Sequence, residues 1–143
     1  MEDDHLTDDE HLRAVAALEA ITTGNDANLA ALTGPGERPL PDLLARYGED
    51  NLHRILLTMV GIDASTGPHE MPRLLAEMNS TQQAQLVYTL TSVLRQTADH
   101  RGADLETAKI IGTAVLRAIG TFIDVDDIAV VLRALRAQVL QRG

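Results

Sequence analysis

Several residue types are scarce in this sequence of 143 residues, which has no cysteine, no tryptophan, one phenylalanine and two tyrosines. Without cysteine the chain has no disulfide framework, no thiol nucleophile and no cysteine-ligated zinc or iron–sulfur site. Aromatic residues make up 2% and hydrophobic residues 45%, so a folded core must consist mainly of aliphatic side chains. Leucine and alanine favour helices, and valine and isoleucine form no alternating runs. We therefore expect no strands.

Long apolar segments are also missing from the sequence. No stretch approaches the roughly 20 apolar residues that span a bilayer. The first residues, Met1 to His5, are acidic. A secretory leader would be basic there and then apolar. The sequence therefore predicts a cytoplasmic protein with no membrane partner.

Basic residues are too few to balance the acidic ones, and the formal net charge is −9. The imbalance is confined to the first part of the chain. Residues 1–63 hold 13 acidic and 4 basic residues, whereas residues 64–143 hold 8 of each. A chain of this charge repels phosphate backbones and anionic lipid, so we expect no nucleic-acid partner. The charge is compatible with a basic protein partner.

Helix signals recur along the chain. Thr7 and Glu10 form a capping box for a helix over 8–22 that stops at Gly24. Capping residues, prolines and apolar periodicity predict a short turn of helix over 26–32, further helices over 41–47, 51–60, 71–78, 81–98 and 104–119, and a final helix that begins after Asp124. In this interpretation Gly48 closes one helix and Asp50 caps the next. The predicted fold class is all-α, a compact bundle of about six to seven helices in which the last three long helices form the core.

The segment 34–41 is the clearest break, with three prolines and two glycines in eight residues. It divides the chain into an acidic N-terminal helical arm over 1–33, a Pro/Gly-rich linker over 34–41 and a helical bundle over 42–143. The length of the chain nevertheless favours a single domain overall.

Apolar stripes mark the expected core faces of the last three helices. The stripes consist of Leu86, Val87, Leu90, Val93 and Leu94 in the first, Leu105, Ala108, Ile111, Val115, Leu116 and Ile119 in the second, and Val125, Ile128, Leu132, Leu135 and Val139 in the third. Gly112 lies within the middle stripe. Because glycine destabilises a helix interior by about 1 kcal/mol relative to alanine, we expect another helix to cross closely at this position.

Acidic and imidazole side chains raise the question of a metal site. Asp50 and His53 lie one helical turn apart, a spacing that resembles half of a metal-binding bundle motif, but no second such motif occurs in a helix interior. His100 follows Asp99 at a helix end, where a cation is favoured by the helix dipole without any metal. The sequence also contains no Gly-x-Ser-x-Gly elbow and no phosphate-binding loop. We predict no cofactor and no metal, with Asp50, His53 and His100 as the weak candidates.

Two surfaces are candidates for binding partners. An apolar surface on the last three helices would form an interface for a homodimer or a partner helix and consists of Tyr88, Ile110, Val130, Ala134 and Ala137. An acidic surface would face a basic protein and consists of Asp3, Asp4, Asp8, Asp9 and Glu10.

These observations favour a non-enzymatic cytoplasmic interaction module, regulatory or adaptor in kind, that self-associates through its C-terminal helices. One alternative is a metal-dependent hydrolase or a small-ligand-binding helical protein. Another is an acidic DNA mimic that inhibits a basic protein. The identity of a partner or ligand does not follow from the sequence.

Overall fold

The computed structural model describes residues 6–34, 37–101, 104–125 and 127–142. Within these residues the chain forms seven helices and no strand, which confirms the all-α prediction. The helices are α1 (Asp8–Thr23), α2 (Asp26–Ala31), α3 (Leu40–Met59), α4 (Met71–Asn79), α5 (Gln82–Arg101), α6 (Leu105–Phe122) and α7 (Ile128–Arg142).

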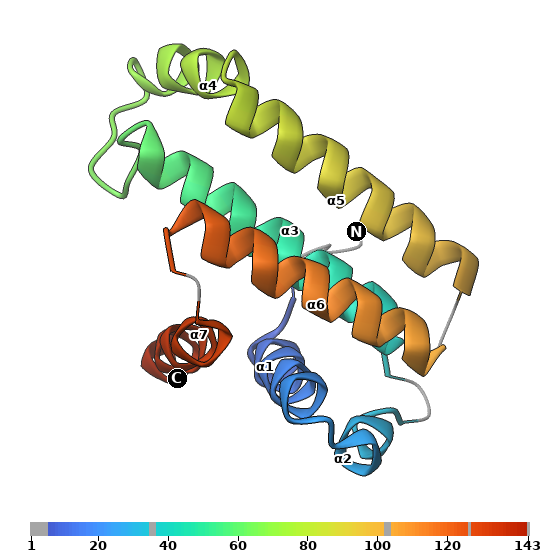
Figure 1. The fold of residues 1–143 in the computed structure, drawn as a ribbon. Coiled ribbons are helices and arrows are strands. Elements are labelled where there is room, and N and C mark those ends of the chain that lie inside the picture. Colours follow the sequence, from blue (N-terminus) through green and yellow to red (C-terminus); the bar gives the residue numbers. More distant parts are fainter. Residues whose placement is uncertain (1–5, 35–36, 102–103, 126, 143) are drawn as a thin grey trace.

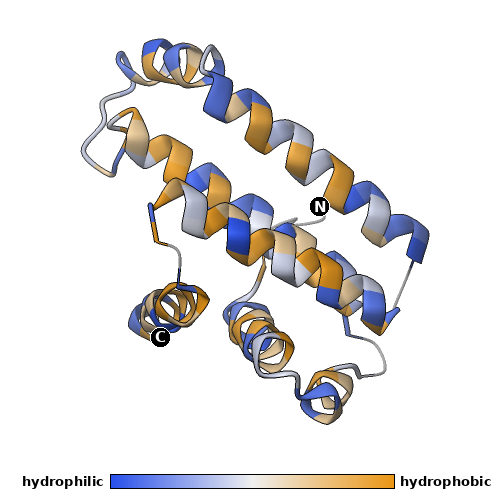
Figure 2. Ribbon diagram, viewed as in Figure 1, coloured by the Kyte–Doolittle hydropathy of each residue, from blue (hydrophilic) through white to orange (hydrophobic). Residues whose placement is uncertain are grey.

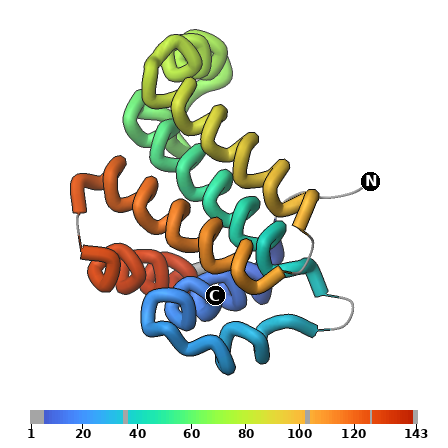
Figure 3. Tube along the Cα trace, turned by 45° about the vertical axis from the view of Figure 1, so that its right-hand side comes forward, coloured from blue at the N-terminus to red at the C-terminus, as the bar shows by residue number. Residues whose placement is uncertain are grey.

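The helices form two layers. Figure 1 shows the long helices α3, α5 and α6 running in similar directions, with α4 at one end, and α1, α2 and α7 seen nearly end-on beneath them. In the turned view of Figure 3, α1 and α7 lie side by side and cross under the long helices. Helix α3 packs against both α5 and α6, while α1 contacts α3, α6 and α7.

Side-chain caps set the helix starts where the sequence predicts them. The capping box at α1 is present, because the Glu10 N–H donates to Thr7 Oγ1 at 3.1 Å and the Thr7 N–H donates to Glu10 Oε1 at 3.0 Å. Asn25 caps α2, and Thr81 caps α5 through the Ala84 N–H at 3.1 Å. These bonds satisfy N–H groups that have no partner inside the helix.

The predicted break at Gly48 is wrong. Helix α3 is continuous, and Gly48 lies in its interior, buried against α6. A Cβ at Gly48 would lie 2.5 Å from Val115 Cγ2, far inside the normal contact distance. Close packing against α6 therefore explains this glycine. Asp50, predicted as a helix cap, is consequently an interior residue of α3.

The last three helices contribute to the core as predicted, and α3 and α1 contribute with them. Buried residues of all five belong to a single cluster, which includes Leu18, Leu44, Val87, Leu116 and Leu135. The close crossing predicted at Gly112 is present, because a Cβ there would lie 2.6 Å from Ile21 Cδ1 and 3.3 Å from Leu18 Cδ2. Helix α1 is the element that crosses there, so the N-terminal segment packs on the other helices. The domain limits at 33 and 41 stay a prediction.

Three of the five residues in the predicted apolar stripe on α5 face the core, and two do not. Val87 and Leu94 are buried and Leu90 is partly buried, but Leu86 and Val93 are exposed. On α7, Leu132, Leu135 and Val139 are buried as expected. This helix begins at Ile128, later than predicted: Asp124 adopts a left-handed conformation with φ 58°, and Asp127 Oδ1 accepts the Ala129 N–H at 3.0 Å.

Candidate functional site

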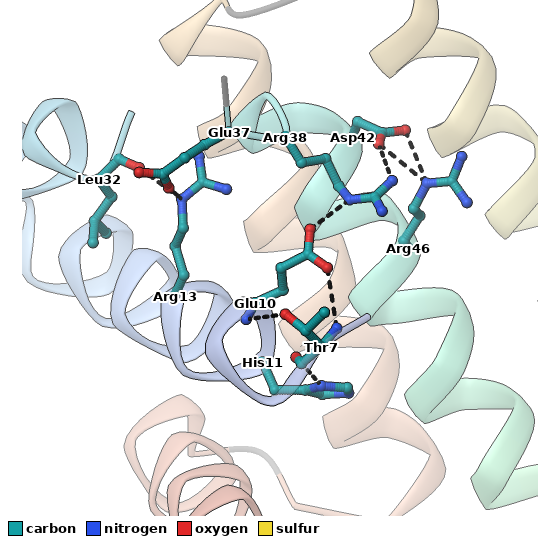
Figure 4. Close-up of polar contacts among 9 residues, drawn as sticks. All are labelled: Thr7, Glu10, His11, Arg13, Leu32, Glu37, Arg38, Asp42 and Arg46. Atoms are coloured by element: carbon teal, nitrogen blue, oxygen red, sulfur yellow. Dashed lines mark hydrogen bonds and ion pairs between the residues drawn. The ribbon is translucent and has the colours of Figure 1, made fainter. Parts of the chain in front are cut away.

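A chain of ion pairs joins the start of α1 to α3 (Figure 4). Arg38 donates from Nε to Glu10 Oε2 at 2.8 Å and from Nη1 to Asp42 Oδ2 at 3.0 Å. Asp42 in turn accepts from Arg46 Nε at 3.1 Å. Burial alone would raise the pKa of Glu10, but hydrogen bonds from Arg38 and from the Thr7 N–H, with the charge of Arg38, hold it below its ordinary value. Glu10 is thus a structural residue as well as a surface acid.

The other members of the predicted acidic surface differ in position. Asp8 and Asp9 are exposed in the first turn of α1, where their charges suit the positive end of the helix dipole. Asp3 and Asp4 lie outside the described residues. The described part of this surface therefore offers two freely exposed carboxylates, because Glu10 is tied to Arg38.

Asp50 and His53 line one cavity of about 550 Å³ between the start of α1, the middle of α3 and α5. Asp50 is half-buried and His53 is exposed. His100 lies exposed in the last turn of α5 and is not among the residues that line this cavity. Among the described residues, no group of three or more histidine, aspartate or glutamate side chains is arranged to hold a metal ion.

His11 is a cavity residue that the sequence reasoning missed. It is 5% exposed, its Nδ1 lies 2.9 Å from the Thr7 carbonyl oxygen, and its ring meets the edge of Tyr47 at 5.9 Å between centroids. A signal was available, because the residue before an N-cap often packs against the fourth helical residue. With Thr7 as the N-cap, these positions are Leu6 and His11, which line the cavity together.

The five predicted interface residues lie on three helices. Tyr88 lines the cavity just described, and its hydroxyl donates to Asn79 Oδ1 at 2.7 Å. Ile110 is exposed on α6. Val130, Ala134 and Ala137 are exposed along α7. Ala134 also lines a second, largely apolar cavity of about 380 Å³ between α3, the end of α6 and α7.

The structure adds two large apolar residues to the exposed set on α5. Leu86 and Val93 are 66% and 53% exposed, while Ile110 on the neighbouring helix is 67% exposed. Leu86, Leu90 and Val93 follow the i, i+4, i+7 spacing of one helix side. Sequence periodicity assigned Leu86 and Val93 to the core because it cannot tell which of two adjacent apolar stripes faces inward.

Comparison of the chain with protein-family models, with curated proteins and with solved structures finds no match. Within the described residues, no helix combines the length and the apolar character that crossing a bilayer requires.

Proposed function

We propose that this chain is a non-enzymatic helical interaction module that self-associates through its C-terminal helices. The observation that supports the proposal most directly is the exposure of Leu86, Val93 and Ile110 on the two adjacent helices α5 and α6. Large aliphatic side chains that gather on a surface are typical of interaction sites, whereas single scattered ones are not informative.

Helix geometry places Leu86, Leu90 and Val93 on one side of α5. The opposite side of α5 carries Tyr88 and Thr91, which line the cavity shared with α1 and α3. The side with Leu86, Leu90 and Val93 is therefore directed away from that cavity, and Leu86 and Val93 on it are exposed. On α6, Ile110 is followed one turn later by the half-buried Ala114. Figure 2 shows apolar residues recurring along both helices.

A second copy of the chain is the occupant that the charge distribution favours. Residues 64–143 hold equal numbers of acidic and basic residues, whereas residues 1–63 carry the whole excess of negative charge. Two copies that met through their N-terminal halves would repel each other. Two copies that meet through α5 and α6 bring charge-balanced surfaces together. Val130 on α7 is a further exposed apolar residue in this balanced half.

The proposal leaves the acidic N-terminal half free in the dimer. Asp8 and Asp9 would then be open to a basic protein partner, which fits a regulatory or adaptor role in the cytoplasm.

Sedimentation velocity on point variants tests the proposal. Leu86→Glu and Ile110→Glu each place a charge on the proposed interface and should shift the chain from dimer to monomer while keeping its helical content. Leu12→Glu is the matched control, because Leu12 is a comparably exposed leucine on α1 in the acidic half. Its variant should stay dimeric. If the α5 and α6 variants sediment like the parent, the interface lies elsewhere.

A further inference from the structure

The cavity of about 550 Å³ carries an inference that is independent of self-association. Its volume lies within the range of small-ligand sites. Elements distant in sequence build it: Leu6 lies just before α1 and His11 at its start, Asp50 and Leu57 come from α3, and Tyr88 from α5.

Two polar side chains in the wall are more than nine-tenths buried, His11 and Thr91. A carbonyl oxygen accepts and never donates, so the bond between His11 Nδ1 and the Thr7 oxygen fixes the ring proton on Nδ1. Nε2 of the neutral ring is then a hydrogen-bond acceptor. The Thr91 hydroxyl donates to the Tyr88 carbonyl oxygen at 3.3 Å, so Oγ1 likewise presents lone pairs.

The remaining polar groups of the wall extend this pattern. The side-chain carboxylate of Asp50 makes no hydrogen bond or ion pair with any described residue. Glu49 accepts from Arg95 Nη1 through one oxygen, at 3.3 Å, which leaves the other oxygen without that partner. The phenol of Tyr88 donates its proton to Asn79. The wall is thus rich in hydrogen-bond acceptors. Its carboxylates carry no proton to donate, and His11, Thr91 and Tyr88 donate theirs to other protein groups.

The cavity is also lined by hydrogen-bond donors, but these lie at its exposed rim. Arg54 and His53 are both exposed, so water solvates their polar atoms at the rim. The buried positions, in contrast, belong to acceptors and to apolar side chains. Leu6 and Val87 are buried and Leu57 is half-buried, and with the Tyr88 ring they give the cavity a hydrophobic wall.

We propose that this cavity binds a small organic ammonium, a primary amine attached to an aromatic or aliphatic group. An ammonium has three donors and no acceptor, which matches the wall formed by Asp50, His11 and Thr91. The hydrocarbon part would pack against Leu57 and Val87. The net charge of −9 raises the local concentration of cations around the whole protein. The described carboxylates and imidazoles do not group as metal ligands, so an organic cation fits better than a metal ion.

The probe for this site is benzylamine, and benzyl alcohol is its uncharged counterpart. Titration of the labelled protein, followed by amide resonances in solution NMR, should shift residues around Asp50, His11 and Thr91. Benzylamine should bind at least about fivefold more tightly than benzyl alcohol, because only the amine can donate three charge-assisted hydrogen bonds. Equal affinities would overturn the proposal, as would shifts confined to other parts of the molecule.

A pair of variants separates the site from general charge attraction. Asp50→Asn removes one negative charge inside the cavity and should weaken benzylamine binding by about fivefold or more. Glu77→Gln removes one negative charge on α4, where Glu77 forms an exposed pair with Arg73. This control should change the affinity by less than about twofold, as expected for a screened distant charge. An equal loss in both variants would contradict a built site.

Discussion

Gly48 of α3 lies directly against Val115 of α6. A Cβ at position 48 would lie 2.5 Å from Val115 Cγ2 and 3.2 Å from Val115 Cγ1. Valine has little freedom about χ1 in a helix, so its methyl groups cannot move aside easily. The closeness of these two helices therefore depends on the missing side chain at position 48.

Gly48→Ala should lower the free energy of unfolding by about 1–2 kcal/mol, because overpacking outweighs the gain of about 1 kcal/mol in helix propensity. Urea denaturation measures the change. Gly67→Ala is the control, since a Cβ at Gly67 meets nothing within 4 Å, and it should alter stability by less than about 0.5 kcal/mol. In a Val115→Ala background the effect of Gly48→Ala should shrink by at least about 0.5 kcal/mol. An unchanged effect there would show that the contact is not its cause.

Gly112→Ala should be milder than Gly48→Ala. The nearest atom to a Cβ at Gly112 is Ile21 Cδ1, the end of a flexible side chain on α1 that is only partly buried. This side chain can rotate away, so the helix-propensity gain offsets most of the strain and the net change should stay within about 1 kcal/mol. Thermal unfolding of the two variants side by side makes the comparison. A larger loss at Gly112 would mean that α1 is held more rigidly than its packing suggests.

The difference between these glycines shows what the sequence could reveal. Gly112 lies inside a long apolar stripe, so a helix crossing was the natural explanation. Gly48 stands beside Glu49 and Asp50, which have the composition of a helix end. Local signals therefore favoured a break, and only the position of Val115 in the folded chain explains the continuous helix. The residues that neighbour Gly48 in the sequence do not indicate such a contact between distant segments.

Only the part of the candidate cavity that comes from a single helix was predictable from the sequence. Asp50 and His53 were recognisable as a pair because they lie one turn apart in one helix. His11 and Thr91 come from other helices, and their burial depends on how α1 and α5 pack against α3. The starts of α1, α2 and α5, in contrast, follow from capping residues next to the helix itself, and the structure confirms them.

Acid should weaken the junction between α1 and α3. The pKa of Glu10 is lower in the folded chain than its ordinary value, so its ion pair stabilises the fold above the unfolded-state pKa. This stabilisation is lost as the pH falls through the folded-state pKa. Glu10→Gln keeps a side chain that can complete the capping box but removes the charge facing Arg38.

The Glu10→Gln variant should therefore be less stable than the parent at neutral pH, by about 1 kcal/mol. The difference should fade in acid, where Glu10 of the parent is protonated. Unfolding titrations across this pH range measure it. Glu77→Gln serves as the control on an exposed ion pair and should change stability by less than about 0.5 kcal/mol at every pH. A constant difference between the Glu10 variant and the parent would exclude the charge as its cause.

His53→Ala should leave both stability and metal content unchanged. His53 is exposed, and substitutions of such residues shift the free energy of unfolding by less than about 0.5 kcal/mol. Elemental analysis of the purified parent should find less than one metal ion per chain, and a chelator should not lower the melting temperature. A stoichiometric metal that is lost in the His53 variant would restore the hydrolase hypothesis.

Sedimentation equilibrium of the unmodified chain over a wide concentration range tests self-association most directly. The proposed dimer predicts a mass that rises to twice the chain mass and stops there, because a twofold interface buries both copies of the α5–α6 face and leaves no further face to propagate. It also predicts that added salt changes the dimer dissociation constant little, since the interface is apolar and its surroundings are charge-balanced. A mass equal to one chain at every concentration would contradict the account.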